Sequence, residues 1–191
     1  MTNEKTVEFI LNKYEIQGQF ESLFAHGKME CLEKGCVIKQ AGKKEQQFRI
    51  LIKGAAIATI YTDSAENCID LFFEEEFCLD ISSFIHQKNS EIEISLIEDC
   101  TFFVINYTNF FALDALNSEI LSVVTDLFFT RKQNQQIGLL SKTPLERLQE
   151  LEKKYGPHLF RIPKFAIASY LGITPQSLSR LLRKTLSVNL G

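Results

Sequence analysis

The sequence lacks the long apolar run that a helix needs to cross a bilayer. Although 45% of its 191 residues are hydrophobic, no stretch of about 18 apolar residues without charges occurs. The N-terminal segment MTNEKTVEFILNKYE has neither the basic start nor the apolar segment of a secretion signal. These absences argue against a membrane-spanning helix, and we expect a cytoplasmic protein with no membrane partner.

The sequence also lacks the spacings that mark metal sites, disulfide frameworks and catalytic clusters. Its five cysteines are an odd number without a C-x-x-C pair, and its three histidines lie far apart. Cys31 and Cys36 are close enough to leave a redox or cluster role open, although an iron–sulfur cluster usually has four grouped thiolates. We therefore expect no metal, no cofactor and no enzymatic activity, with the cysteines acting as small buried hydrophobic residues.

Positive charge is not in excess overall, but it is unevenly distributed. The chain has 21 basic and 24 acidic residues, a net charge of −3. From Lys142 to the last residue there are nine basic and three acidic residues, and no acidic residue follows Glu152. An acidic body joined to a basic C-terminal segment is typical of a sensing or assembly domain followed by one that contacts nucleic acid.

The most informative segment is IPKFAIASYLGITPQSLSRLLRK, residues 162–184. Its first half carries apolar residues at helical spacing and stops at Gly172, which can adopt the left-handed backbone of a sharp turn. Thr174 then offers an N-cap hydroxyl, and Pro175 suits the first position of a second helix. Two short helices around a tight turn indicate a helix-turn-helix.

The second of these helices separates apolar and polar residues. Leu178 and Leu181 face the first helix, so the polar side chains face outward. Arginine pairs bidentately with guanine, glutamine with adenine, and a hydroxyl at a helix N-terminus can hold a phosphate. The candidate DNA-binding residues are Lys164, Thr174, Gln176, Ser177, Ser179, Arg180 and Arg183. An ordinary helical hairpin with a solvated basic face remains the alternative.

Short runs rich in β-branched and aromatic residues fill the middle of the chain. Residues 1–30 have helical and loop-like character. After them come CVIKQAG, FRILIKG, AAIATIYT, CIDLFF, IEISLI and TFFVINY, separated by polar clusters. Several short strands at this spacing predict an antiparallel barrel, roll or sandwich.

A long helix is predicted over residues 117–140. Its stripe consists of Ile120, Val123, Leu127, Thr130, Asn134 and Ile137. The stripe fits a dimer seam whose polar members set the register, and it fits a helix packed on its own barrel. A seam is slightly favoured because helix-turn-helix modules usually bind as two-fold pairs.

The next helix has well-defined ends. Thr143-Pro144-Leu145-Glu146 forms a capping box with proline at the first helical position, and Gly156-Pro157 closes the segment. We expect GLLSK (138–142) to interrupt the long helix. The chain is therefore divided into three parts: a β-roll domain (1–116), a linking helix (117–140) and a helix-turn-helix domain (141–191).

In this order of parts the chain resembles the Crp/Fnr family of bacterial transcription regulators. The motifs are KGCVIKQAG (34–42), FRILIKG (48–54) and IASYLGITPQSLSRLLRK (167–184). The resemblance implies an α+β fold: an antiparallel, jelly-roll-like double-stranded β-roll of the cyclic-nucleotide-binding type, a long dimerisation helix and a winged helix-turn-helix. It also implies a homodimer bound to double-stranded DNA, with RNA polymerase as a further candidate partner.

The expected effector pocket departs from the pattern of nucleotide-binding members. There, a Gly-Glu-Leu loop and an arginine cradle the cyclic phosphate. Aligning EEFCLDISSF (75–84) to that loop places Leu79, Asp80 and Ser90 where the glycine, glutamate and arginine belong. Without the arginine an anion is poorly held, so cyclic AMP and cyclic GMP are not expected effectors. The candidate pocket residues are Asp80, Ser82, Ser83, Lys88 and Ser90.

The C-terminal end departs as well, because only TLSVNLG follows Lys184, too short for a β-hairpin wing. The positions that contact bases in the family correspond to Pro175, Gln176 and Arg180, and proline cannot read a base through a polar group. Gln176 and Arg180 are thus the expected base readers of a sequence-specific regulator. The alternative is a ligand-binding or protein-interaction module with a vestigial helix-turn-helix.

Overall fold

A β-sandwich forms the centre of the molecule. The computed structural model describes residues 3–18, 20–63, 65–113 and 115–188. The strands are β1 (Lys28–Leu32), β2 (Val37–Lys39), β3 (Gln47–Lys53), β4 (Ala56–Thr62), β5 (Ala65–Phe72), β6 (Ile92–Leu96) and β7 (Cys100–Asn106). They make a three-stranded sheet in the order β1-β7-β3 and a four-stranded sheet in the order β2-β6-β4-β5. Every pairing is antiparallel, which confirms the predicted class of sheet.

Each of the six runs predicted as strands overlaps one strand of the structure, but the sequence missed β1. This strand pairs with β7, with Lys28 opposite Val104 and Leu32 opposite Cys100. Glycine closes the turn after β3: Gly54 has a φ of +104°, and a Cβ there would lie 2.5 Å from the Cys100 sulfur. Only a residue without a side chain fits so close a backbone approach.

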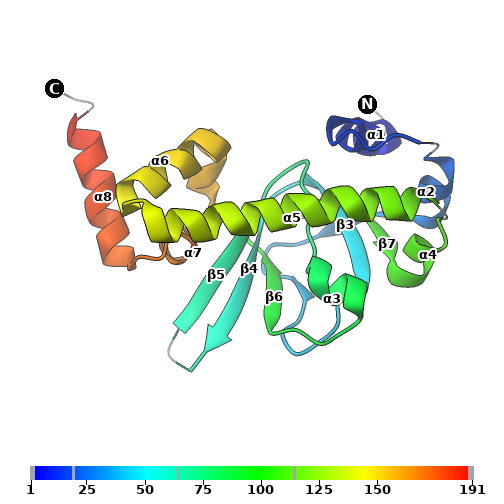
Figure 1. Cartoon of the computed structure of the whole chain (residues 1–191), viewed down its shortest axis with the longest axis horizontal. Coiled ribbons are helices and arrows are strands. Elements are labelled where there is room, and N and C mark those ends of the chain that lie inside the picture. Colours follow the sequence, from blue (N-terminus) through cyan, green and yellow to red (C-terminus); the bar gives the residue numbers. More distant parts are fainter. Residues whose placement is uncertain (1–2, 19, 64, 114, 189–191) are drawn as a thin grey trace.

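Helices flank the sandwich and make up the C-terminal part. They are α1 (Asn3–Lys13), α2 (Glu21–His26), α3 (Ile81–His86), α4 (Tyr107–Phe111), α5 (Ala115–Ser141), α6 (Pro144–Tyr155), the 3₁₀-helix η1 (Gly156–Arg161), α7 (Lys164–Tyr170) and α8 (Pro175–Val188). Figure 1 shows α5 running nearly the length of the molecule, with α1 and α2 at one end and α6 to α8 at the other.

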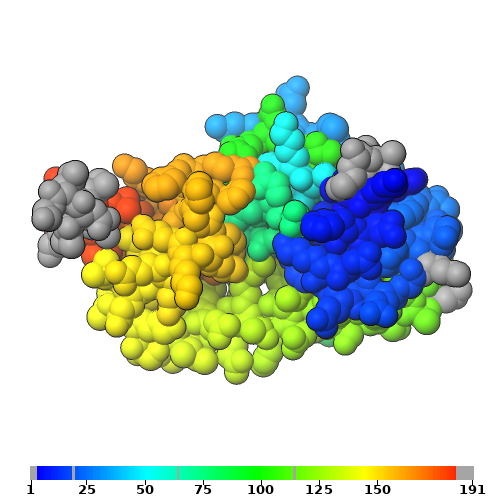
Figure 2. All heavy atoms as spheres, turned by 90° about the horizontal axis from the view of Figure 1, so that it is seen from above, coloured from blue at the N-terminus to red at the C-terminus, as the bar shows by residue number. Residues whose placement is uncertain are grey.

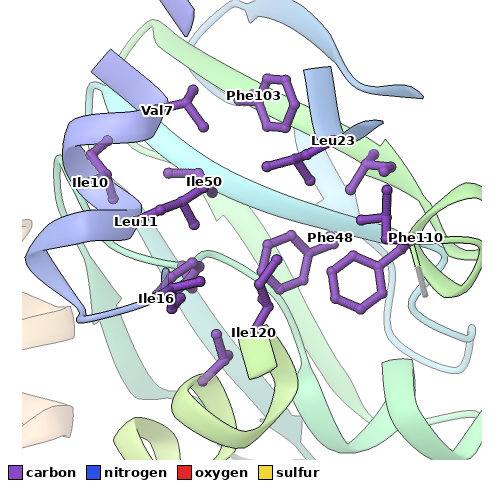
Figure 3. Packing of buried hydrophobic residues seen from close by; sticks show 14 of the residues in the cluster. Val7, Ile10, Leu11, Ile16, Leu23, Phe48, Ile50, Phe103, Phe110 and Ile120 are labelled. Carbon is purple, nitrogen blue, oxygen red and sulfur yellow. The ribbon is translucent and has the colours of Figure 1, made fainter. Parts of the chain in front are cut away.

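Two apolar cores stabilise the body. One lies under the N-terminal helices, where side chains from α1, α2, β3, β7, α4 and α5 converge around Phe48 (Figure 3). Phe48 stacks on Phe110 with ring centroids 4.6 Å apart. The other lies between the sheets and includes Leu51, Ala58 and Phe102. Burial of these side chains is the main favourable contribution to folding.

The stripe on α5 meets two different environments. Ile120 is fully buried in the core of its own body. Thr130 and Asn134 are exposed, and Ile137 is 49% exposed. The first part of the stripe therefore packs on its own β-sandwich, and the second part is open. The helix also continues through Gly138 to Ser141, so the expected interruption falls at the end of GLLSK.

The C-terminal helices pack directly against the sandwich. Leu151, Tyr155 and Ala166 share one buried cluster with Leu71 and Phe73. The Ser169 hydroxyl donates a hydrogen bond to the Cys68 backbone oxygen (3.3 Å). Seen from above in Figure 2, the N-terminal and C-terminal helices occupy opposite ends of the molecule. The position of the C-terminal helices is thus set by contacts with β5 and the residue that follows it.

None of the helices in the described residues is long and apolar enough to span a membrane. Among the same residues, no three His, Cys, Asp or Glu side chains gather in a way that could hold a metal ion. All five cysteines are free; Cys68, Cys78 and Cys100 are buried, as expected of small hydrophobic residues, whereas Cys31 is exposed.

Candidate functional sites

A tight turn joins α7 to α8. Gly172 has a φ of +66°, and a Cβ at this position would come within 2.6 Å of a methyl carbon of Leu139. The Ile173 amide donates to the Ala168 oxygen (2.9 Å), which closes the C-terminus of α7. Glycine is required here for its backbone angle, as the sequence predicted, whereas the Leu139 methyl belongs to an exposed side chain that can move aside.

The start of α8 has the predicted cap. The Ser177 amide donates to the Thr174 hydroxyl (3.2 Å), and the Leu178 amide donates to the Thr174 backbone oxygen (3.0 Å). Pro175 occupies the first helical position, where no backbone donor is needed. Leu178 is completely buried against α7, which fixes the rotation of α8 about its axis.

With Leu178 inward, the opposite face of α8 points to solvent. Gln176, Arg180 and Arg183 are exposed, while Ser177 and Ser179 are half-buried. Gln176, Ser179 and the two arginines line a shallow open hollow together with Pro175. Within the described ranges, neither Arg180 nor Arg183 forms an ion pair.

Two of the candidate DNA-binding residues already use their hydroxyls in hydrogen bonds within the protein. The Ser179 hydroxyl donates to the Pro175 backbone oxygen (3.0 Å), and the Thr174 hydroxyl donates to that of Ser177 (3.0 Å). Lys164 is exposed at the first position of α7. The structure thus brings six of the seven candidates together around the start and the outer face of α8, with Lys164 on the neighbouring helix.

Three of the candidate effector residues, Asp80, Ser83 and Ser90, form a hydrogen-bonded network at the start of α3. Asp80 is the N-cap of this helix and accepts a hydrogen bond from the Ser83 amide (3.1 Å). The Ser90 hydroxyl donates to the other carboxylate oxygen of Asp80. The Ser83 hydroxyl donates to the backbone oxygen of Lys88 (2.6 Å). Ser82 and the Lys88 side chain lie outside this network, and both residues are exposed.

Lys39, which the sequence did not single out, completes the network. Its ammonium donates to the backbone oxygen and the hydroxyl of Ser90 (2.9 and 2.8 Å) and lies 3.7 Å from Asp80. Lys39 is 3% exposed. A buried ammonium needs such partners, and here it provides the positive charge beside Asp80 without presenting a donor to a ligand.

A cavity of about 320 Å³ lies beside this network, between the four-stranded sheet, the start of α3 and α5. Most of its lining is apolar. The lining residues are Ala58, Ile69, Asp70, Phe72, Leu79, Asp80, Ile81, Ser82, Ile92, Ile94, Thr125, Phe128, Phe129 and Lys132. Of the candidate effector residues, only Asp80 and Ser82 reach it.

An ion-pair cluster fixes α5 to the sheet at the edge of this cavity. Arg131 donates to Asp70 (3.2 Å) and to Glu76 (2.9 Å), and Lys132 lies 3.0 Å from the second oxygen of Asp70. Burial raises the pKa of Glu76, although the charge of Arg131 acts in the opposite direction. The cluster therefore serves to position α5.

A second cluster fixes the C-terminal helices. Arg161 donates to both oxygens of Glu74 and to both oxygens of Glu98. Partial burial acts to raise the pKa of Glu74, but hydrogen bonds from Arg161 and from the backbone outweigh it and hold the pKa below its usual value. Arg161 belongs to the basic C-terminal segment, yet its charge is used inside the molecule.

The whole arrangement matches solved structures of bacterial regulators. FixK2 from Bradyrhizobium japonicum has a TM-score of 0.73 at 14% identity, covering 85% of this chain and 86% of its own. CLP, the c-di-GMP-responsive global regulator of Xanthomonas campestris, has 0.68 at 16% identity, covering 90% and 92%. A protein of Eubacterium rectale described as a Crp/Fnr-family transcriptional regulator has 0.69 at 15% identity, covering 87% and 82%.

These similarities confirm, at the level of the fold, the resemblance that the sequence motifs indicated. The chain has the fold of the Crp/Fnr transcription regulators, with its cyclic-nucleotide-binding-like sandwich in front of the C-terminal helices. No protein-family profile and no curated protein matches the sequence.

Proposed function

We propose that this protein is a sequence-specific DNA-binding transcription regulator of the Crp/Fnr type. The observation that carries the proposal is the outer face of α8. Gln176, Arg180 and Arg183 project from a helix whose inner face is anchored by Leu178. An exposed helix whose arginines form no ion pair with any described residue has the dimensions and chemistry to enter a major groove.

Within this helix-turn-helix, Gln176 and Arg180 read bases. Their side chains offer the paired donors and acceptors that recognise adenine and guanine. Thr174, Ser177, Ser179, Arg183 and Lys164 contact phosphates or give auxiliary contacts, since hydroxyls at a helix N-terminus and cations suit that role. Residues 189–191 are the end of the TLSVNLG segment, which is too short for a wing, and they lie outside the described residues.

The protein acts as a homodimer through the second half of α5. Ile137 and Leu140, one turn apart, are 49% and 83% exposed. Apolar exposure on one helix face is covered when two copies pair, and pairing also sets two copies of α8 on one DNA site. The working units are residues 1–116 as sensor, 117–140 as connecting helix and 141–191 as DNA-binding domain. We place this function in the cytoplasm, with RNA polymerase as a further partner.

The sensor does not respond to cyclic AMP. A cyclic phosphate would meet Asp80, while the nearby ammonium of Lys39 is already committed to Ser90 and Ile92. Desolvating a phosphate without a cation is strongly unfavourable. Calorimetric titration with cyclic AMP and cyclic GMP tests this: no heat of binding is expected, and micromolar binding of either would refute it.

DNA binding is tested by gel shift on the DNA upstream of the protein's own gene, over a series of salt concentrations. A regulator of this kind should prefer one segment over random DNA and should lose affinity steeply as salt rises. The double variant Gln176→Ala with Arg180→Ala should lose the preference for that DNA segment but keep the fold. Equal, weak affinity of the unmodified protein for every DNA would support a vestigial helix-turn-helix instead.

A further inference from the structure

We propose that the cavity between the four-stranded sheet and α5 binds an uncharged, largely apolar small molecule, and that this molecule is the effector. The role as effector rests on the proposed function, whereas the binding itself does not. The volume of about 320 Å³ accommodates a compact organic molecule. The chemical class follows from the walls and from the charges around them.

Most of the cavity wall is apolar, and apolar side chains come both from sheet strands and from α5. Ile92 and Ile94 come from β6, Phe72 from β5, and Phe128 from α5. Water in contact with such surfaces is readily displaced by an apolar molecule, because removing apolar area from water is favourable. A sugar phosphate would find few partners here, and an aliphatic or aromatic molecule many.

The charges around the cavity are already neutralised by protein groups. Asp70 accepts hydrogen bonds from Arg131 and the Leu71 amide at one oxygen; the other accepts no hydrogen bond from the described residues but forms an ion pair with Lys132. Asp80 is held by the Ser83 amide at one oxygen and by Ser90 at the other.

Lys132 in turn donates to the Ile69 backbone oxygen (2.6 Å) and lies 3.0 Å from Asp70. Neither a ligand anion nor a ligand cation therefore gains a free counter-charge, and each would still lose its hydration. The uncharged hydroxyls of Ser82 and Thr125 on the lining leave room for one or two neutral polar groups.

The cavity is placed to influence the C-terminal helices. Thr125, Phe128, Phe129 and Lys132 line it from α5, the helix that leads directly into the C-terminal part. Arg131, between them in sequence, ties the same turn to Asp70 and Glu76. A ligand that contacts Phe128 favours one position of α5, and a ligand shifts an equilibrium by its difference in affinity for the two states.

The experiment titrates the full-length protein with N-phenyl-1-naphthylamine, a neutral probe that fluoresces in apolar surroundings. Decanol, decanoate and cyclic AMP then compete with the bound probe, so that chain length is matched between a neutral and an anionic molecule. The variant Thr125→Trp places a large side chain at the cavity wall. Ser122→Trp, exposed on the same helix and absent from the lining, is its matched control.

Saturable binding of one probe per chain, displaced by decanol at least about tenfold more effectively than by decanoate and not by cyclic AMP, is the expected result. Thr125→Trp should abolish binding and Ser122→Trp should keep it. Thr125→Phe, a smaller change, should weaken it. Decanol should also raise the thermal unfolding midpoint of the unmodified protein and of Ser122→Trp but not of Thr125→Trp.

The inference would be overturned by the absence of saturable binding, by unchanged binding in a folded Thr125→Trp variant, or by decanoate or cyclic AMP competing as well as decanol. Binding that appears only when the protein is diluted to monomers would also overturn it, because a second copy would then occupy the cavity beside the 64% exposed Phe129. A protein that binds the probe but no DNA sustains the binding and refutes the proposed function instead.

Discussion

Arg161 holds the carboxylate of Glu74 through two parallel hydrogen bonds, of 2.8 Å from Nη1 to Oε2 and 2.7 Å from Nη2 to Oε1. The same guanidinium bonds Glu98, 63 residues earlier in the chain. Arg161 ends η1, and its two partners lie at the edge of the sandwich. One side chain therefore joins the C-terminal helices to the β-sandwich.

Replacing this arginine should loosen that junction. Arg161→Ala removes charge-assisted hydrogen bonds from a side chain that is 26% exposed, and we expect a loss of about 1 to 3 kcal/mol in the free energy of unfolding. Limited proteolysis should cut near residues 156–163 faster in the variant. Lys153→Ala, an exposed lysine of α6 without an ion pair in the described part of the chain, is the control. Equal cleavage of both variants would show that the apolar contacts alone hold the junction.

The pairing of Glu74 should also give the junction a dependence on pH. Because the folded protein lowers the pKa of Glu74 below its ordinary 4.5, the pairing stabilises fully above that value and is lost as the pH falls through the folded pKa. The unmodified protein should therefore unfold at a higher temperature than Glu74→Gln near neutral pH, and this difference should shrink in acid.

Thermal unfolding of the two proteins across the acid range provides the measurement. Glu66→Gln, on the exposed part of β5, is the control and should differ little from the unmodified protein at any pH. A difference between the unmodified protein and Glu74→Gln that grows as the pH falls would contradict the assignment.

The parts that the sequence predicted correctly are those with local signals. Thr174 and Pro175 define the start of α8, and Gly172 the turn before it, because caps and left-handed residues act within a few positions. The strand runs are recognisable from their β-branched and aromatic residues. In β1, KMECL, charged residues alternate with Met29 and Cys31 and the pattern is too weak to predict a strand.

The parts that the sequence missed depend on contacts between distant residues. Lys39 meets Ser90 across 51 residues, and Arg161 meets Glu74 across 87. No local pattern specifies such pairs, since they depend on how the strands are paired and how the C-terminal helices dock. Aligned positions predicted Asp80 and Ser90 as pocket residues, but only the structure shows that Lys39 bonds Ser90 and pairs with Asp80, and that Ser90 does not line the cavity.

The closed polar network predicts that Lys39 is important for stability. Lys39→Met leaves Asp80 buried without its counter-charge, and breaking a buried pair on one side typically costs about 3 to 5 kcal/mol. Adding Asp80→Asn keeps an N-cap for α3 and removes the unpaired charge, so the double variant should recover part of the loss. Urea unfolding measures all three proteins. A double variant less stable than Lys39→Met would mean that Asp80 stabilises chiefly by other contacts.

The two environments of α5 can be separated with a matched pair of substitutions. Ile120→Ala opens a hole in the core and should cost about 2 to 5 kcal/mol of unfolding free energy. Ile137→Ala removes a side chain that is half exposed in one chain, so it should leave the folded chain nearly as stable but weaken the dimer. Urea unfolding and sedimentation at several concentrations distinguish these effects. A monomeric unmodified protein, or an Ile137→Ala dimer of unchanged strength, would exclude a seam at this position.

Arg180 and Lys164 should affect DNA binding in different ways. Arg180→Ala removes the proposed guanine contact and should cost about 1 to 3 kcal/mol on the preferred DNA, with relaxed specificity at one base pair in each half-site. Lys164→Ala removes a phosphate contact, so it should weaken preferred and random DNA alike and reduce the dependence on salt. Gel shifts on both DNAs at several salt concentrations separate the two. Since Arg180 has no ion pair to lose in the described residues, a loss that Arg180→Ala shows equally on preferred and random DNA would assign it to the backbone instead of the bases.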